Sequence, residues 1–216
     1  MTKADIFEPF EEMPCFSKKN IRIYFKGLEF ALNERIKRSL ENERIAKLKK
    51  GLYTTDVYYL KEPNKTGFKE FIASKLKFPS YLSLEYVLSK YNLLTEATYP
   101  LTSITLKTGR SYQNSLGTYK YSNIKEALYF GFKEVSFYQN IYFVATKAKA
   151  LFDFLYLKRN LGDLNTEILE SLRINWENFS FSDFLLFKKY VSKSMSKKME
   201  KISKILERNI YNGRNS

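Results

Sequence analysis

The stretch RIAKLKKGLYTT, residues 44–55, predicts a β-hairpin with a positively charged tip. Apolar residues and lysines alternate over residues 46–49, which is the period-two pattern of a strand with one buried face. Lys50-Gly51 then supplies a turn, and residues 52–55 return as the second strand. The lysines of this hairpin are Lys47, Lys49 and Lys50.

Three helices are expected before the hairpin. Residues 2–12 are predicted to form a short helix that is broken or bent at Pro9. Ser17 is placed to cap a second helix, which ends at Gly27. Over residues 28–42, apolar side chains recur at every fourth position and predict a third helix with one buried stripe. Three helices followed by a hairpin is the order of a winged helix-turn-helix, whose third helix enters the DNA major groove.

The charge distribution favours a polyanionic partner. The chain has a formal net charge of +14, and residues 17–53 hold eleven Lys and Arg against four Glu. Such an excess favours nucleic acid, although A+T-rich codon usage would also raise the lysine content. Solvated lysines are common at hairpin turns, and winged helices also serve as protein-binding modules. A protein-interaction module that never contacts DNA is therefore the alternative.

The candidate DNA contacts fall into three groups. Lys18 and Lys19 begin the second helix and are expected to contact phosphates, as are the three hairpin lysines. Asn33, Lys37 and Arg38 lie on the exposed side of the third helix and are expected to read the groove. An asparagine can pair with the edge of adenine and an arginine with guanine.

The residue types argue against an enzyme. The chain has no histidine, which excludes histidine-based triads and histidine general bases. Its single Cys15 excludes an internal disulfide, and no glycine-rich phosphate loop is present. No acidic residue is followed two positions later by lysine, as in many metal-dependent nucleases. We expect no catalytic site, metal or cofactor. A nuclease that uses acids such as Asp153 and Asp163 is a weaker third hypothesis.

The expected location is the cytoplasm, with no membrane contact. The start MTKADIFEPF carries acids and a proline where a signal peptide needs an apolar run. No run of about 18 apolar residues occurs.

A polar break, KEPNKTG at residues 61–67, predicts a boundary between domains 1–60 and 61–216. The second domain is expected to be mixed α+β, so the whole chain is assigned to the α+β class. Its predicted elements are helices near 68–76 and 83–91, strands within 98–108, 110–114, 117–124 and 140–146, a buried helix from 147 to 158, and helices over 160–216.

Four segments of the second half resemble one protein family in order and spacing. They are FPSYLSLEYVL at 78–88, TSITLKTGRSYQNSLGTYKYSNI at 102–124, FVATKAKALFDFLYL at 143–157 and LRINWENF at 172–179. The family is that of AbiEi-type antitoxins, the transcriptional regulators of AbiE (type IV) toxin–antitoxin systems in phage defence. The resemblance covers about residues 16–207.

This resemblance implies an antitoxin that represses its own operon through an N-terminal winged helix. Its partners would be operator DNA and a nucleotidyltransferase toxin, and we expect a monomer in solution. By position, the matched family residues are Ser80, Tyr81, Ser83, Glu85, Lys149 and Asp153. Lys147 and Ala148 depart from the family, which usually has Pro-Glu there. The alternative is that the matched residues have structural roles only, such as a helix cap at Ser83 and an ion pair between Asp153 and Lys149.

Overall fold

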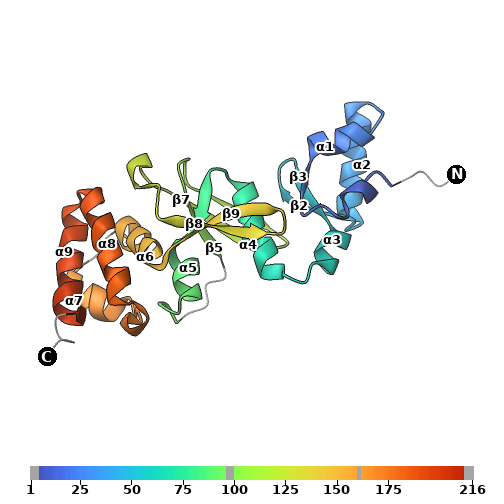
Figure 1. The fold of residues 1–216 in the computed structure, drawn as a ribbon. Coiled ribbons are helices and arrows are strands. Elements are labelled where there is room, and N and C mark those ends of the chain that lie inside the picture. Colours follow the sequence, from blue (N-terminus) through green and yellow to red (C-terminus); the bar gives the residue numbers. More distant parts are fainter. Residues whose placement is uncertain (1–4, 96–99, 160–161, 212–216) are drawn as a thin grey trace.

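The computed structural model describes residues 5–95, 100–159 and 162–211, and it has a mixed α+β fold with two β-sheets. The molecule is elongated, and Figure 1 shows the two chain termini at opposite ends with the larger sheet between them. The expected α+β class is confirmed. Among the described residues, no helix has both the length and the apolar character needed to cross a bilayer.

The N-terminal end contains a small three-stranded sheet and two helices. Its elements are η1 (Glu8–Phe10), β1 (Phe16–Ser17), α1 (Lys18–Tyr24), α2 (Glu29–Glu41), β2 (Ile45–Lys49) and β3 (Leu52–Thr55). The strand order is β1-β3-β2, with both pairs antiparallel. The predicted hairpin is confirmed, and Gly51 takes the positive φ of +78° that its turn requires.

The first predicted helix is wrong in length. Within the described part of residues 2–12, only Glu8–Phe10 forms a single 3₁₀ turn, and residues 2–4 lie outside the described residues. Pro9 lies in the first turn of this 3₁₀ helix, where proline is tolerated, and it disfavours a helix that begins further upstream. The cap at Ser17 is confirmed, because its side chain accepts from the backbone N–H of Asn20.

Two hydrophobic cores stabilise the chain. The smaller core is formed by buried residues of the N-terminal end, namely Phe7, Phe10, Phe16, Ile21, Leu32, Ile36, Ile45 and Tyr53. The larger core extends through the rest of the chain and also includes Leu48 of β2. One strand of the hairpin therefore contributes to both cores. The domain boundary between residues 60 and 61 falls inside α3 (Asp56–Lys61) and stays a prediction.

The central sheet has six strands in the order β6-β7-β5-β4-β9-β8. The strands are β4 (Ser80–Leu82), β5 (Leu101–Thr105), β6 (Arg110–Asn114), β7 (Gly117–Asn123), β8 (Phe132–Phe137) and β9 (Asn140–Ala145). The β5–β7 and β4–β9 pairs are parallel and the others are antiparallel. Helix α4 (Lys65–Leu76) packs against β4, β5, β8 and β9. Thr98 and Tyr99, the predicted start of β5, lie outside the described residues.

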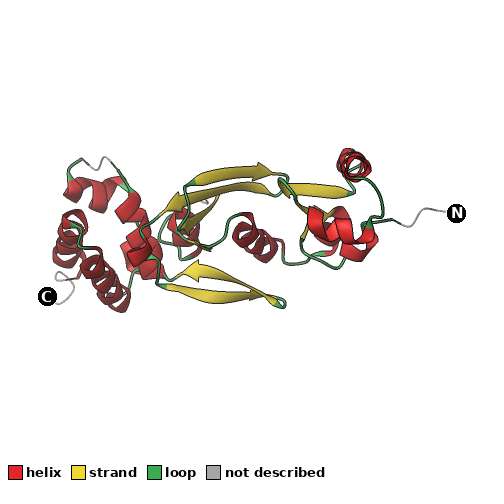
Figure 2. Cartoon of the chain, turned by 90° about the horizontal axis from the view of Figure 1, so that it is seen from above, coloured by secondary structure: helices red, strands yellow, loops and turns green. Residues whose placement is uncertain are grey.

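Helices cover the C-terminal end of the molecule. Figure 2 shows the strands lying between helices at both ends. The remaining elements are α5 (Leu84–Lys90), η2 (Glu126–Leu128), α6 (Lys147–Leu157), α7 (Leu164–Thr166), η3 (Glu167–Ser171), η4 (Trp176–Asn178), α8 (Phe181–Ser194), α9 (Lys197–Leu206) and η5 (Glu207–Tyr211). The predicted helical character of this end is confirmed for its described residues.

Candidate functional site

A polar cluster joins α1 to α2. The ammonium group of Lys18 forms an ion pair with Glu29 and donates to Oδ1 of Asn33 at 2.6 Å. The hydrogen bond from Lys18 lowers the pKa of Glu29, so this carboxylate stays ionised well below neutral pH. Two of the predicted DNA contacts, Lys18 and Asn33, are thus bonded to each other. A bidentate contact of Asn33 with adenine needs the same oxygen as acceptor and competes with Lys18.

Five of the predicted DNA contacts are exposed cations. They are Lys19 on α1, Lys37 and Arg38 on α2, and Lys47 and Lys50 on the hairpin. Lys37 lies 4.0 Å from Glu41, one helical turn away, and both side chains are about two-thirds exposed. An ion pair this open is weak, so the Lys37 ammonium can exchange its partner for a phosphate.

Lys49 is half-buried and hydrogen-bonded to α4, whereas the sequence predicted a free, exposed side chain. Its ammonium group donates to the carbonyl oxygens of Lys75 and Leu76, each at 2.9 Å, at the end of α4. Burial lowers the pKa of Lys49, and Lys107 and Lys77 add to this effect, whereas Cys15 acts in the opposite direction. These two hydrogen bonds compete with the predicted phosphate contact of Lys49. Its charge neutralises the partial negative charge of a helix C-terminus.

The hairpin is attached to the second half at a further point. The side-chain amide of Asn114, at the end of β6, donates to the backbone carbonyl of Leu48 at 3.0 Å. A register shift between Lys47 and Lys49 accompanies this contact, and Leu48 is buried in the larger core. The irregularity lets neighbouring residues of one strand serve different surfaces. Lys47 faces solvent while Lys49 contacts α4.

Four of the six matched family residues meet in one buried network. Asp153 on α6 accepts hydrogen bonds from the hydroxyl groups of Tyr81 at 3.0 Å and Ser83 at 2.8 Å. The Lys149 ammonium lies 2.7 Å from the other carboxylate oxygen, and it also donates to the carbonyl of Leu128 at 2.8 Å. The side chains of Lys149 and Asp153 are fully buried. The predicted ion pair is confirmed, and this network joins β4 to α6.

Burial acts on both charges of this pair. It raises the pKa of Asp153 and lowers the pKa of Lys149, while their mutual attraction acts in the opposite direction for each group. Burial and the Asp153 charge also raise the pKa of Tyr81, which keeps its hydroxyl group protonated as a donor. Two hydroxyl groups donate to one carboxylate oxygen and the ammonium group lies beside the other, so the two buried charges are compensated locally.

Two matched residues lie outside the buried network. Ser80 donates to the carbonyl of Lys77 at 2.6 Å and closes the turn before β4. Glu85 is half-buried in the first turn of α5. Ser83 occupies the cap position of α5, but its side chain does not cap the helix because it donates to Asp153. The predicted capping bond of Ser83 is therefore wrong, although its place at the helix start is confirmed.

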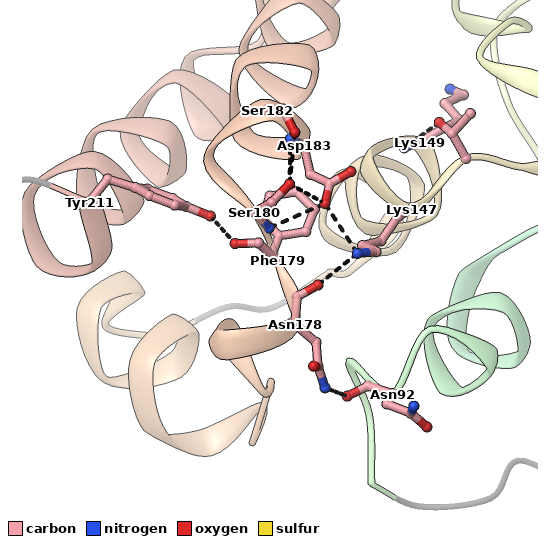
Figure 3. A network of polar contacts seen from close by, with 10 residues as sticks. Asn92, Lys147, Lys149, Asn178, Phe179, Ser180, Ser182, Asp183 and Tyr211 are labelled. Carbon is pink, nitrogen blue, oxygen red and sulfur yellow. Dashed lines mark hydrogen bonds and ion pairs between the residues drawn. The ribbon is translucent and has the colours of Figure 1, made fainter. Parts of the chain in front are cut away.

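Lys147, at the start of α6, has two partners in later parts of the chain. Figure 3 shows its ammonium group between α8 and the segment before it, 3.2 Å from a carboxylate oxygen of Asp183 and donating to the carbonyl of Asn178 at 2.8 Å. The cap of α6 comes from Thr146, whose hydroxyl accepts from the N–H of Lys149. The contacts of Lys147 thus join the start of α6 to α8 and to the segment before it.

A second buried carboxylate was not predicted. Glu70 on α4 accepts from the hydroxyl groups of Tyr86 and Tyr142, at 2.5 and 2.6 Å, and from the ammonium group of Lys90 at 2.5 Å. The signal in the sequence was one acid within the mostly apolar run GFKEFIASKL. An ionised side chain inside a buried helix needs several donors, and tyrosines are abundant in this chain.

The acids of the nuclease hypothesis lie in different surroundings. Asp153 is fully buried, whereas Asp163 caps α7 by accepting from the N–H of Thr166 at 2.9 Å. Within the described residues, no three or more His, Cys, Asp or Glu side chains are close enough together to hold a metal ion. Both carboxylates therefore have structural hydrogen-bond partners, Asp153 in a buried network and Asp163 at a helix cap.

A basic surface lies along α9. Its exposed cations are Lys197, Lys201, Lys204 and Arg208, and some of them line hollows together with Lys158 and Arg159. Lys198 differs from them, because it donates to three carbonyl oxygens at the end of α6. Both a solvated helix face and a partner contact are consistent with this surface.

Comparison with known proteins gives no relative from which a function can be transferred. A scan against protein families finds no match to this chain, and a search of curated proteins likewise finds no significant match.

Proposed function

We propose that the N-terminal end is a winged helix-turn-helix that binds duplex DNA, and that the chain regulates transcription. The observation that carries this proposal is the order β1, α1, α2, β2, β3, with β1 paired to the hairpin and only residues 25–28 between the two helices. In such a domain the second helix of the pair lies in the major groove and the hairpin lies beside it.

The exposed cations are arranged to neutralise phosphates. In the proposed complex, α2 enters the groove with Lys37 and Arg38, while Lys19 and the hairpin residues Lys47 and Lys50 contact the backbone. Each lysine that neutralises a phosphate releases a counterion, so binding weakens as salt rises. Lys49 takes no part, because it already neutralises the end of α4.

A mobility-shift titration tests this function. The labelled probe is the DNA immediately upstream of the gene, and the competitor is a random duplex of equal length. Retention of the upstream probe against excess random duplex is expected. Two double variants, each of which removes two positive charges, distinguish a specific DNA-binding surface from the general basicity of the chain. Lys47→Ala with Lys50→Ala should weaken binding, and Lys125→Ala with Lys133→Ala, exposed residues of the second half, should leave it unchanged.

The resemblance to AbiEi-type antitoxins extends the proposal to the second half of the chain. This part would counter a nucleotidyltransferase toxin encoded beside it. The support is that Tyr81, Ser83, Lys149 and Asp153, four matched positions from two distant segments, interact directly. Such a shared network supports a common fold for the matched segments. Co-expression with the neighbouring gene product tests the activity, and loss of its growth inhibition is the expected result.

A protein-interaction module is the second candidate function, and two observations favour it. Glu34 and Glu41 lie among the cations of α2, and the hairpin is partly occupied by contacts with the chain's own second half. Acidic side chains on a groove-reading helix repel phosphates, so they weaken DNA binding. Absence of any shift with either duplex at low salt would favour this candidate over DNA binding.

A further inference from the structure

The N-terminal turn of α2 displays large apolar side chains to solvent. Leu28, at the cap position, is 80% exposed, and Phe30 is 74% exposed. Ile23, near the end of α1, is 75% exposed. Single exposed apolar residues are ordinary, but a group of them within eight residues of one helix-turn-helix indicates a contact surface.

The spacing along α2 explains why Phe30 cannot join the core. Leu32 and Ile36 are buried, and they define the inward face of the helix. Phe30 precedes Leu32 by two residues, which places it about 200° around the helix from that face. It therefore lies on the outward side together with Glu34 and Lys37, the side that faces DNA in the proposed function.

Cations surround this apolar turn. Lys19, Arg22 and Lys26 are exposed on α1 and on the segment that joins it to α2. The nearby acid Glu29 is paired with Lys18. A partner at this surface must tolerate or neutralise several positive charges. A second copy of the same surface would bring like charges together, whereas a duplex offers phosphates on both sides of a groove.

We propose that Leu28 and Phe30 read thymine methyl groups in the major groove. In helix-turn-helix complexes the N-terminal residues of the recognition helix contact base edges. The C5-methyl group of thymine is the apolar feature of that groove, and phenylalanine is among the side chains that contact it. The preferred DNA is thus a duplex with thymines at the positions facing this turn. This inference rests on the proposed function and adds the chemistry that it recognises.

Removal of the methyl groups alone tests the inference. The upstream fragment is amplified once with thymidine and once with deoxyuridine, and the two products compete for the protein in a mobility-shift assay. Burial of one methyl group corresponds to about a fourfold change in affinity. The thymine fragment should therefore bind about fourfold tighter for each methyl group contacted.

Two double variants make the test specific. Leu28→Ala with Phe30→Ala removes the apolar reader, and both fragments should then bind equally. Leu60→Ala with Met195→Ala changes two other exposed apolar residues, which are 69% and 86% exposed, and should keep the thymine preference. All four side chains are exposed, so neither variant should disturb folding.

The outcomes separate the two proposals. Equal binding of both fragments by the unchanged protein leaves the proposed function standing and overturns this inference. A thymine preference that persists in the Leu28→Ala, Phe30→Ala variant also overturns it. Failure to bind either fragment removes the proposed function and this inference together. Light scattering of the unbound protein completes the test: a dimer that this variant dissociates would assign the surface to self-association instead.

Discussion

The ammonium group of Lys49 lies 2.9 Å from the carbonyl oxygen of Leu76, so the predicted DNA-binding hairpin is tied to the last turn of α4. A helix end leaves carbonyl groups without partners inside the helix, and a cation placed there is favourable. The same ammonium group also donates to the carbonyl oxygen of Lys75 at the same distance. The hairpin therefore holds the two halves of the chain together.

Replacement of Lys49 by methionine should lower the free energy of unfolding by about 1–2 kcal/mol. Methionine keeps much of the apolar stem but leaves two carbonyl groups without their charged donor. Urea denaturation measures the change. Lys50→Met is the matched control, because this neighbouring side chain is exposed, and its effect should stay within about 0.5 kcal/mol. Equal effects of the two variants would contradict the role assigned to Lys49.

Charge removal at Lys47 and Lys50 should change the salt dependence of DNA binding. The logarithm of the affinity falls linearly with the logarithm of salt concentration, and each lost phosphate contact flattens the slope by about one unit. Lys47→Ala with Lys50→Ala should thus flatten the slope by about two units, whereas Lys49→Met should not alter it. Fluorescence anisotropy over a series of salt concentrations measures both. An unchanged slope in the double variant would show that the hairpin does not contact phosphates.

Periodicity predicted much of the fold because the signals are local. The inward positions Leu32 and Ile36 of α2, the cap at Ser17 and the glycine of the hairpin turn each depend on neighbouring residues alone. Leu28, the first position of the same apolar repeat, was predicted to be buried but is exposed, because it lies before the first turn of the helix. The strands β4 and β8 were not predicted. Strand β4 has only three residues, and its partners β5 and β9 lie far away in the sequence, so its pairing is a tertiary effect.

The candidate site shows the same division between local and long-range signals. Exposure of Lys37 and Arg38 follows from the helical period, but the contacts of Lys49 with α4 depend on a bulge and on how the two halves pack. Lys149 and Asp153 lie one helical turn apart, so their ion pair was predictable from the spacing in the sequence. The hydroxyl groups of Tyr81 and Ser83 come from about seventy residues earlier. No periodic pattern connects them to Asp153.

The thiol of Cys15 should react slowly with alkylating reagents in the folded protein. Burial raises the pKa of this thiol to about 11, although the ammonium groups of Lys75 and Lys49 act to lower it. The thiolate is the reactive form, so the rate should rise with pH until about pH 11. Mass spectrometry of iodoacetamide-treated protein over a pH series measures this profile.

Loss of the Lys49 charge should slow the reaction of Cys15 further. Lys49→Met removes a cation that favours the thiolate, so the pKa of Cys15 should rise and the rate at a given pH should fall. The unfolded chain in concentrated urea is the reference, where the thiol should titrate near its ordinary value of about 8.5. A folded-state profile that matches this reference would contradict the burial of Cys15.

Removal of Asp153 should destabilise the second half strongly, because it leaves the Lys149 ammonium buried without its counter-charge. Asp153→Leu is expected to cost about 3–5 kcal/mol, whereas Tyr81→Phe, which removes one donor, should cost about 1 kcal/mol. The double variant Lys149→Met, Asp153→Leu should be more stable than Asp153→Leu alone, since no unpaired charge remains. Urea denaturation gives the three values. If the network serves the fold and does not itself contact a toxin, the double variant should also recover toxin neutralisation in the co-expression assay. A double variant that is stable but cannot neutralise would assign these buried residues a direct part in antitoxin activity.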